Sequence, residues 1–438
     1  MKRRKLLNTR KVMRLCFYNP HAVTNAVGVT VLARLAQIFG TNKDNLRKHN
    51  LKYEFLLNIL RDSRYDTAIV VDGAGTSFST VLSKTPFLKN SHFIYRLIAS
   101  GEIYLWCWLN DLNPFKQRII FNRKKLDEKS DILFSFAFCT EMFLNEQMIE
   151  KSTIKSFGGK KLLHASHFYK LTKKISENVR KSGTKYMVAE ADLKKSPYFN
   201  KFFGFIDEVY VLPHVLRKRY VKTKGFEERK NICLALGTLV IEDESDESNK
   251  DYFDFFQTDT LHPMRKAIFE NKASLTGLID CNINFHNKDR IAITNKSNLY
   301  KKSNIFKILY DLFFLSEGKE YHSMNIVEKY NEYKMFIAPE ENIGLSSINL
   351  IEGMACGCAY IGIDHPMYTD LGMIDKQHYI AYNGTLDDLR NKIQYYQSHS
   401  QELADIAQNG YAFAKKRFSE KRITDDFMKY LITLSTAV

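Results

Sequence analysis

Short apolar runs alternate with charged stretches through the first half of the chain. The runs are apolar on both faces, which is typical of buried strands. They are Val12–Tyr18, Thr67–Asp72, Glu102–Trp108, Ile132–Phe138, Lys161–His164, Tyr186–Ala189 and Glu208–Leu212. Helix-like stretches lie between most of them, and Val29–Phe39 is one example. This alternation predicts a parallel sheet that is covered on both faces by helices.

A basic, polar stretch at Arg217–Lys230 interrupts this alternation, and a new strand with the letters ICLALGT begins at Asn231. The alternation resumes further on, with helix Ile326–Tyr333, strand Met335–Ala338, helix Ser346–Cys356 and strand Ala359–Ile363. We therefore predict two α/β domains, residues 1–225 and 226–420, and a terminal segment at residues 421–438.

The tail of the chain is predicted to be helical. Leu389, Ile393 and Tyr396 recur at helical spacing and share one face. Ile423, Phe427 and Leu431 share a second face of this kind. Both apolar faces need a surface to cover.

The charge of the chain narrows the choice of partner. The 65 Lys and Arg residues outnumber the 49 Asp and Glu residues, which gives a net charge of +16 and indicates an acidic partner. Nucleic acid, an anionic lipid surface and a phosphorylated small molecule all fit that description. The chain has no Arg/Gly-rich tail, zinc-ligand spacing or RNP-like aromatic string, which disfavours nucleic acid. The acidic segment IEDESDESNKD, after the ICLALGT strand, is expected to be an exposed loop because clustered like charges repel.

Size and cysteine usage indicate a cytoplasmic protein. The 438 residues are 45% hydrophobic, enough for two cores. Seven cysteines occur without a CxxC pair and mostly inside apolar runs, which is typical of reduced, buried thiols. We expect no signal peptide, and apolar runs such as Ile132–Phe138 are far shorter than the roughly 20 residues of a membrane-spanning helix. Any membrane contact is therefore expected to be peripheral.

The most informative stretch is Pro339–Gly362, with the letters PEENIGLSSINLIEGMACGCAYIG, between two predicted strands. Ser346 and Ser347 suit the start of a helix, whose unpaired N–H groups and dipole favour a phosphate or diphosphate. Gly344 permits close approach of a ligand to the backbone. Glu352, about two turns further on, is placed to accept hydrogen bonds from ribose hydroxyls.

These residues resemble the signature of glycosyltransferase family 4, whose members have the GT-B fold. In that family an acidic, Gly-rich loop leads into a helix ending in Glu-Ala-Met-Ala-Cys-Gly, and LIEGMACGCAYIG is similar to it. The resemblance implies two Rossmann-like, doubly wound domains facing across a cleft, with the last helix packing back on the N-terminal domain. It assigns ribose binding to Glu352. The loop amides that hold the diphosphate and the sugar map onto Gly344, Leu345, Ser346 and Ser347.

The chain departs from the family pattern at the first of two glutamates. The family usually places this residue eight positions before the second, where this chain has Gly344. Either the loop is longer and Glu341 reaches the sugar, or the sugar hydroxyls are bound differently; we favour the first. An alternative for the whole stretch is that EGMACG is simply a small-residue helix packed on a sheet.

The resemblance also implies residues of the N-terminal domain. The loop after the first strand, which contains Gly28, occupies the place where family members contact acceptor or phosphate, although a tight turn also explains this glycine. Family members often have an active-site histidine at a strand end, which His164 or His167 would supply; each also suits a structural role. At the next strand end Glu190 and Asp192 occur where relatives can show another histidine.

The family usually sets an Arg and a Lys against the donor diphosphate, and the expected Arg after ICLALGT is absent. Arg265 and Lys266 are the replacements that the sequence offers. The chain has no DxD motif, so the resemblance implies charge stabilisation without a metal or other cofactor.

The predicted function is retaining transfer of a sugar from a nucleotide-diphosphate sugar to a saccharide or lipid-linked acceptor. This would suit bacterial surface polysaccharide or glycoconjugate synthesis in the cytoplasm, and the basic surface could hold the protein at the inner, anionic face of the plasma membrane. The alternatives are a GT-B-like epimerase or phosphorylase, and a non-catalytic nucleotide-sugar-binding subunit.

Overall fold

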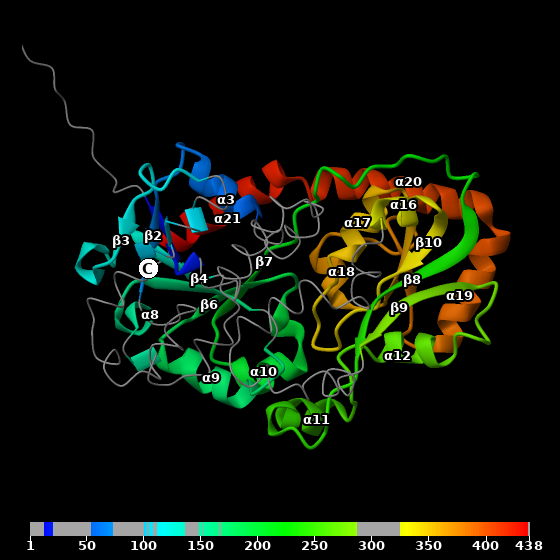
Figure 1. Ribbon diagram of the computed structural model, residues 1–438, viewed down its shortest axis with the longest axis horizontal. Coiled ribbons are helices and arrows are strands. Elements are labelled where there is room, and N and C mark those ends of the chain that lie inside the picture. Colours follow the sequence, from blue (N-terminus) through cyan, green and yellow to red (C-terminus); the bar gives the residue numbers. More distant parts are fainter. Residues whose placement is uncertain are drawn as a thin grey trace, which may run out of the picture.

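Two α/β halves lie side by side in the computed structural model of the chain (Figure 1). The structure describes residues 13–20, 54–72, 100–135, 149–286 and 325–436, apart from gaps at 102, 105, 108–111, 151 and 166–167. The predicted helix Val29–Phe39 lies outside these residues.

The N-terminal domain is built on one parallel sheet. Its strands are β1 Arg14–Tyr18, β2 Thr67–Val70, β3 Ile119–Ile120, β4 Asp131–Ser135, β5 Lys160–His164, β6 Tyr186–Ala189 and β7 Glu208–Val211. Their order across the sheet is β3-β2-β1-β4-β5-β6-β7, and every neighbouring pair is parallel. Six of the seven strands predicted in this half are therefore confirmed.

The strand predicted at Glu102–Trp108 is wrong, because the described residues of this segment are helical. Ile103, Trp106 and Cys107 are buried, whereas Tyr104 is exposed. Burial at intervals of three and four residues is the period of a helix, not of a strand. The run is apolar enough to suggest a strand with two buried faces. Only the burial pattern in the structure distinguishes a helix from a strand here.

The C-terminal domain is built on a second parallel sheet. Its strands are β8 Lys230–Val240, β9 Ile279–His286, β10 Tyr333–Ile337, β11 Ala359–Ile363 and β12 Ile380–Tyr382, in the order β12-β11-β10-β8-β9. All four neighbouring pairs are parallel. The predicted fold class, α/β with two doubly wound domains, is confirmed.

Helices cover both sheets (Figure 1). Those of the N-terminal half include α3 Glu54–Arg61, α8 Thr153–Ser156, α9 Thr172–Lys181 and α10 Pro197–Phe203. Those of the C-terminal half are α11 Lys250–Phe256, α12 Pro263–Glu270, α16 Ile326–Asn331, α17 Asn349–Ala355, α18 Pro366–Asp370, α19 Leu386–Ser398, α20 Ser400–Arg417 and α21 Glu420–Thr436. Leu389, Ile393 and Tyr396 are buried along α19, which confirms the predicted apolar face.

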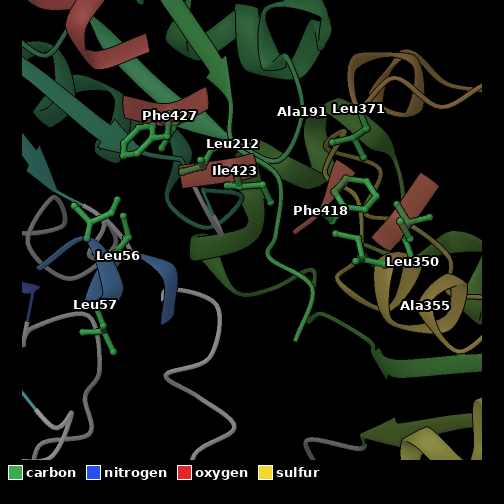
Figure 2. Packing of buried hydrophobic residues seen from close by; sticks show 14 of the residues in the cluster. Leu56, Leu57, Ala191, Leu212, Leu350, Ala355, Leu371, Phe418, Ile423 and Phe427 are labelled. Carbon is green, nitrogen blue, oxygen red and sulfur yellow. The ribbon is translucent and has the colours of Figure 1, made fainter. Parts of the chain in front are cut away.

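The last helix, α21, runs back to the N-terminal sheet (Figure 1). Its Phe427 packs on Phe134 of β4 with ring centroids 5.6 Å apart, and its Tyr430 stacks on Tyr210 of β7 at 4.1 Å. In Figure 2, Ile423 and Phe427 lie near Leu212, and all three belong to one apolar cluster that spans both domains. Burial of this helix face therefore joins the two sheets.

A second contact between the domains comes from α11. Phe255 and Phe256 pack on Tyr198 of α10, with ring centroids 5.2 and 5.1 Å apart. This helix begins at Lys250, within the acidic segment at residues 241–251 that the sequence predicts to be an exposed loop. Residues 243–247 are exposed as predicted. The prediction is wrong for Asn249, which is buried, and for Glu242, whose carboxylate is buried beside Lys170.

Candidate functional site

A cavity of about 290 Å³ lies between the two domains, at the carboxyl ends of their strands. This is where open parallel sheets place their ligands. The N-terminal domain contributes Tyr169, Glu190 and His214. The C-terminal domain contributes Thr238, Val240, Glu242, Leu261, His262, Arg265, Glu341, Leu345, Ser346, Ser347 and Ile348. Residues predicted from the signature stretch are thus brought together with residues that the sequence did not single out.

A tight turn shapes the C-terminal wall of this interdomain cavity. The Gly344 N–H donates to the Glu341 carbonyl at 3.0 Å, and the Glu341 N–H donates to the Leu345 carbonyl at 3.3 Å. Gly344 has φ +95°, a conformation that other residues adopt only with strain. The turn packs on the N-terminal domain, where the Ser196 hydroxyl donates to the Ile343 carbonyl at 3.2 Å. Gly344 is itself buried in this contact and does not line the cavity.

The backbone after the turn offers hydrogen-bond donors to the cavity. Helix α17 begins at Asn349, three residues later than the predicted start at Ser346. Among the described residues, the N–H groups of Ser346, Ser347 and Ile348 donate to no backbone or side-chain acceptor. These three residues line the cavity, and backbone amides without an intramolecular acceptor are a common feature of anion sites.

The two adjacent acids before the turn have different environments. Glu340 is buried in the C-terminal domain, and its Oε1 accepts hydrogen bonds from the Tyr360 hydroxyl at 3.0 Å, the Ile363 N–H at 3.1 Å and the Tyr368 hydroxyl. Burial raises the pKa of Glu340, and these donors oppose the rise. Glu341 lines the interdomain cavity. Of the two acids, Glu341 and not Glu340 is therefore part of the cavity lining.

Arg265 and Lys266 are adjacent in α12 but point to different partners. Arg265 is 7% exposed, lines the cavity, and donates from Nη1 to the Thr238 carbonyl at 3.0 Å. Its guanidinium lies against Gly237, where a Cβ atom would come within 2.6 Å of Nε. Arg265 thus occupies the space beside the ICLALGT strand end, where the family's Arg is missing. Lys266 is paired with Asp259 at 2.6 Å and does not line the cavity.

A buried carboxylate lies between two histidines at the N-terminal wall. Glu190 follows β6 and is 4% exposed. Its Oε1 is 3.3 Å from Nε2 of His214 and 3.7 Å from Nε2 of His164. Glu190 and His214 line the cavity, whereas the predicted His164 is not one of its lining residues. His167 and Gly28, the other residues predicted for this domain, lie outside the described residues.

His214 could have been found from its position in the sequence. It comes three residues after β7, which ends at Val211, just as the predicted His167 comes three residues after the end of β5 at His164. Asp192, also considered for this wall, has another role: its N–H donates to Asp370 Oδ2 at 3.1 Å and its side chain accepts from the Lys194 N–H.

Glu242 links the two walls of the cavity. The carboxylate is 5% exposed and accepts from Lys170 Nζ at 2.9 Å and from the Tyr169 hydroxyl at 3.4 Å. Both donors belong to the N-terminal domain. The run of like charges around Glu242 hid this role, because the sequence gives no sign that the first acid of the run turns inward.

Glu352, the predicted ribose ligand, is 4% exposed and does not line the cavity. Its Oε1 is paired with Nη2 of Arg217, which comes from the basic stretch between the domains. Burial raises the pKa of Glu352, and the charge of Arg217 and the hydroxyl of Tyr220 oppose the rise. The carboxylate lies in α17, four residues beyond the cavity-lining Ile348.

Three further findings concern the described residues alone. They contain no group of three or more His, Cys, Asp or Glu side chains that could hold a metal ion. They contain no helix whose length and apolar character would let it cross a bilayer. Six of the seven cysteines are free thiols, and all but Cys281 are buried.

Comparisons with known proteins bear on the C-terminal domain most directly. Residues 315–429 match the family model described as glycosyl transferase-like. No curated protein is significantly similar to the chain in sequence.

Solved structures resemble the chain over nearly its whole length. They include HepE from Anabaena in complex with UDP, at 11% identity and a TM-score of 0.46 over 96% of this chain and 100% of that one. A glycosyltransferase from Rickettsia africae has 11% identity and a TM-score of 0.48 over 98% and 100%. Sucrose-phosphate synthase from Thermosynechococcus elongatus has 9% identity and a TM-score of 0.45 over 97% and 100%. The stretch at residues 315–429 is thus similar to glycosyl transferases, and it includes Glu341 and Leu345–Ile348, which line the interdomain cavity.

Proposed function

We propose that the interdomain cavity binds the diphosphate and sugar of a nucleotide-diphosphate sugar, and that the enzyme transfers this sugar with retention to a saccharide or lipid-linked acceptor. One observation supports this most strongly. Glu341 and Ser346–Ile348, from the glycosyltransferase-like stretch, share one cavity with Arg265 and with the Glu190–His214 pair of the other domain. Sugar transfer requires the donor and the acceptor to be held close together, and a cavity lined by both domains can do this.

Arg265 and the loop amides are assigned to the leaving group. As the glycosidic bond breaks, the nucleoside diphosphate gains negative charge, and fixed positive groups stabilise that charge most where water is excluded. Arg265 is held in place by the Thr238 carbonyl at 3.0 Å, so its charge is already oriented. The N–H groups of Ser346 and Ser347 supply further donors at the same wall. This assignment uses no metal, and we expect activity to persist in excess EDTA.

The carboxylates are assigned to the hydroxyl groups of the sugars. Glu341 and Glu242 line the C-terminal side of the cavity, and ionised carboxylates accept hydrogen bonds from hydroxyls. Glu190 with His214 faces the same space from the N-terminal domain, which is the side expected for the acceptor. There the pair would orient the attacking hydroxyl and receive its proton as the new bond forms.

The acceptor and the cellular role follow from the family resemblance and from charge. A net charge of +16 suits a phosphorylated lipid carrier or an anionic membrane surface. We propose action at the cytoplasmic face of the plasma membrane in bacterial surface polysaccharide or glycoconjugate synthesis. Co-sedimentation with vesicles containing anionic lipid, lost at high salt, is the expected result; equal binding to neutral vesicles would contradict the electrostatic part.

The assignment is tested by donor turnover. The protein is incubated separately with UDP-glucose, UDP-N-acetylglucosamine, GDP-mannose and ADP-glucose, and release of nucleoside diphosphate is measured with and without saccharide acceptors. We expect release from one donor class, and loss of release in Glu341→Gln. The matched control is Glu244→Gln, which changes an exposed acid of the 243–247 segment.

Two results would contradict the proposal. One is a Glu341→Gln variant that is as active as the wild type. The other is binding of these donors without turnover under all acceptor conditions, which would favour a non-catalytic nucleotide-sugar-binding subunit. The anomeric configuration of the product, read by NMR, tests retention separately.

A further inference from the structure

An ion pair joins the stretch between the domains to helix α17. Arg217 lies between β7, which ends at Val211, and β8, which begins at Lys230. Its Nη2 is paired with Oε1 of Glu352, and the two side chains are 15% and 5% exposed. The pair is therefore largely dehydrated, and charged groups in such surroundings need good partners. Neither residue lines the interdomain cavity; Glu352 comes four residues after Ile348, which does.

The guanidinium of Arg217 has more donors than this contact uses. Its Nε and Nη1 are buried, and within the described residues neither makes a hydrogen bond. The Tyr220 ring lies near the guanidinium, with its centroid 5.3 Å from Cζ, but offers a π face and no oxygen at that contact. Buried N–H donors without an acceptor are costly and uncommon in native proteins. Two of them on one side chain indicate a place prepared for an acceptor.

Arg229, at the end of the same basic stretch, shows what a purely structural arginine looks like here. It is 4% exposed. Its Nη2 donates to the Lys224 carbonyl at 3.0 Å, Asn331 Oδ1 at 3.2 Å and the Cys356 carbonyl at 2.8 Å, and its Nη1 is 3.7 Å from Cys358 Sγ. Both terminal nitrogens are thus used by the fold, and only its Nε lacks a hydrogen bond within the described residues. Arg217 is held by one carboxylate, and its Nε and Nη1 donors make no hydrogen bond within the described residues.

We propose that Arg217 is a binding residue for the nucleoside part of the donor, donating from Nε and Nη1 to ribose or base oxygens while its Nη2 holds Glu352. The inference rests on the proposed nucleotide-sugar function. The ion pair is neutral as a whole, which suits hydroxyl and carbonyl oxygens better than phosphate. The diphosphate has its own cation in Arg265, which lines the cavity. Because Glu352 lies beyond the cavity-lining end of the loop, the pair extends the site from the diphosphate toward the nucleoside.

Binding measurements on the full chain test this assignment. The wild type is titrated calorimetrically with UDP, GDP, ADP, CDP and dTDP, and the tightest ligand is then compared with its monophosphate. Arg217→Lys keeps a positive charge for Glu352 but removes the planar fork with its Nε and Nη1 donors. We expect about tenfold weaker binding of the diphosphate and of the monophosphate, which is a loss of about 1.4 kcal/mol in each case. The melting temperature without ligand should change little.

Arg219→Lys is the matched control. Arg219 is an exposed arginine two residues away that also lies over Tyr220, at 4.9 Å, and donates from Nη2 to the Tyr220 hydroxyl. Its substitution should leave nucleotide binding unchanged. Arg217→Gln provides a second variant, in which loss of charge should lower both affinity and melting temperature.

Three results would overturn the inference. Unchanged affinity in Arg217→Lys would make Arg217 only a structural partner of Glu352. A loss seen with the diphosphate but not with the monophosphate would assign Arg217 to the terminal phosphate instead. Equal losses in Arg219→Lys would show a general charge effect. If the wild type binds none of the five nucleotides, the proposed function itself fails, whereas binding that Arg217→Lys leaves intact rejects this inference alone.

Discussion

The two walls of the interdomain cavity are built in different ways. The C-terminal wall takes Glu341, Ser346 and Ser347 from one continuous stretch, in which they are a few residues apart. The N-terminal wall takes Glu190 from the end of β6 and His214 from the segment after β7. A continuous stretch can carry a recognisable signature, whereas a wall assembled from separate strand ends depends on how the sheet is ordered.

The same contrast divides the proposed chemistry. The C-terminal wall is assigned to the donor, whose diphosphate is common to many enzymes of this kind. The N-terminal wall is assigned to the acceptor, where specificity must differ from one enzyme to another. Substitutions on the two walls should therefore affect donor binding and transfer differently, and the following experiments test that difference.

The largest effect is expected at Arg265. In Arg265→Gln the leaving group loses its fixed cation, and nucleoside diphosphate release should fall by about 10²–10³-fold. The control is Lys266→Gln, in the neighbouring position of α12. Because Lys266 pairs with Asp259 outside the cavity lining, its substitution should leave turnover within about twofold. Equal losses in the two variants would show that α12 matters only through the fold.

His214→Gln should separate transfer from donor binding. Loss of a proton acceptor at the acceptor side is expected to lower the transfer rate by about 10²-fold. The affinity for the nucleotide sugar, measured by titration calorimetry, should stay the same because His214 belongs to the other wall. If the variant instead bound the nucleotide sugar more weakly and kept the wild-type transfer rate at saturating donor, His214 would belong to the donor side. The proposed division between a donor wall and an acceptor wall would then be wrong.

Gly344→Ala should cost about 1–2 kcal/mol of stability, because an alanine is strained at φ +95°. Gly277→Ala is the matched control, since Gly277 has φ +84° and a Cβ added there meets nothing within 4 Å. Both variants should have lower melting temperatures. Only Gly344→Ala should also weaken nucleotide binding, since its turn sets the positions of Glu341 and Leu345. Unchanged nucleotide binding in Gly344→Ala would show that the turn does not position the binding residues.

The smallest effect concerns Glu340, the acid that does not face the cavity. Burial raises its pKa above the ordinary value, so the folded state holds a proton that the unfolded state releases. The stabilisation from that proton is complete below the unfolded pKa and is lost as the pH rises through the folded pKa. In Glu340→Gln the free energy of unfolding should therefore depend less on pH across this window. Urea unfolding at several pH values measures the slope, and an unchanged slope would contradict the assignment.

Much of the fold could be predicted because buried parallel strands are short apolar runs. Six predicted strands of the first sheet and the helical face at Leu389 required no tertiary information. The segment at Glu102–Trp108 failed because its letters are apolar on every side, so that only burial reveals the helical period. Strand β9, Ile279–His286, was missed because Asp280, Asn282 and Asn284 interrupt its apolar pattern.

The site was predictable where its residues are local in sequence. The loop residues from Glu341 to Ser347 lie where a signature match can find them, and the family model covers them. Arg217 lay in a basic stretch that indicates only a domain boundary. Glu242 was hidden in an acidic run, and the pairing of Glu190 with His214 depends on β6 and β7 being neighbours. Long-range contacts of this kind leave no pattern in a single sequence.

The place where a nucleotide binds decides whether the interdomain cavity is the donor site. Hydrogen–deuterium exchange of the full chain is compared with and without a saturating nucleoside diphosphate. We predict slower exchange in residues 341–352 and 212–220, on the two sides of the Arg217–Glu352 pair. We predict no change in residues 158–161, at the opposite ends of the strands. Protection that leaves 341–352 unaffected would contradict the assignment of the interdomain cavity as the donor site.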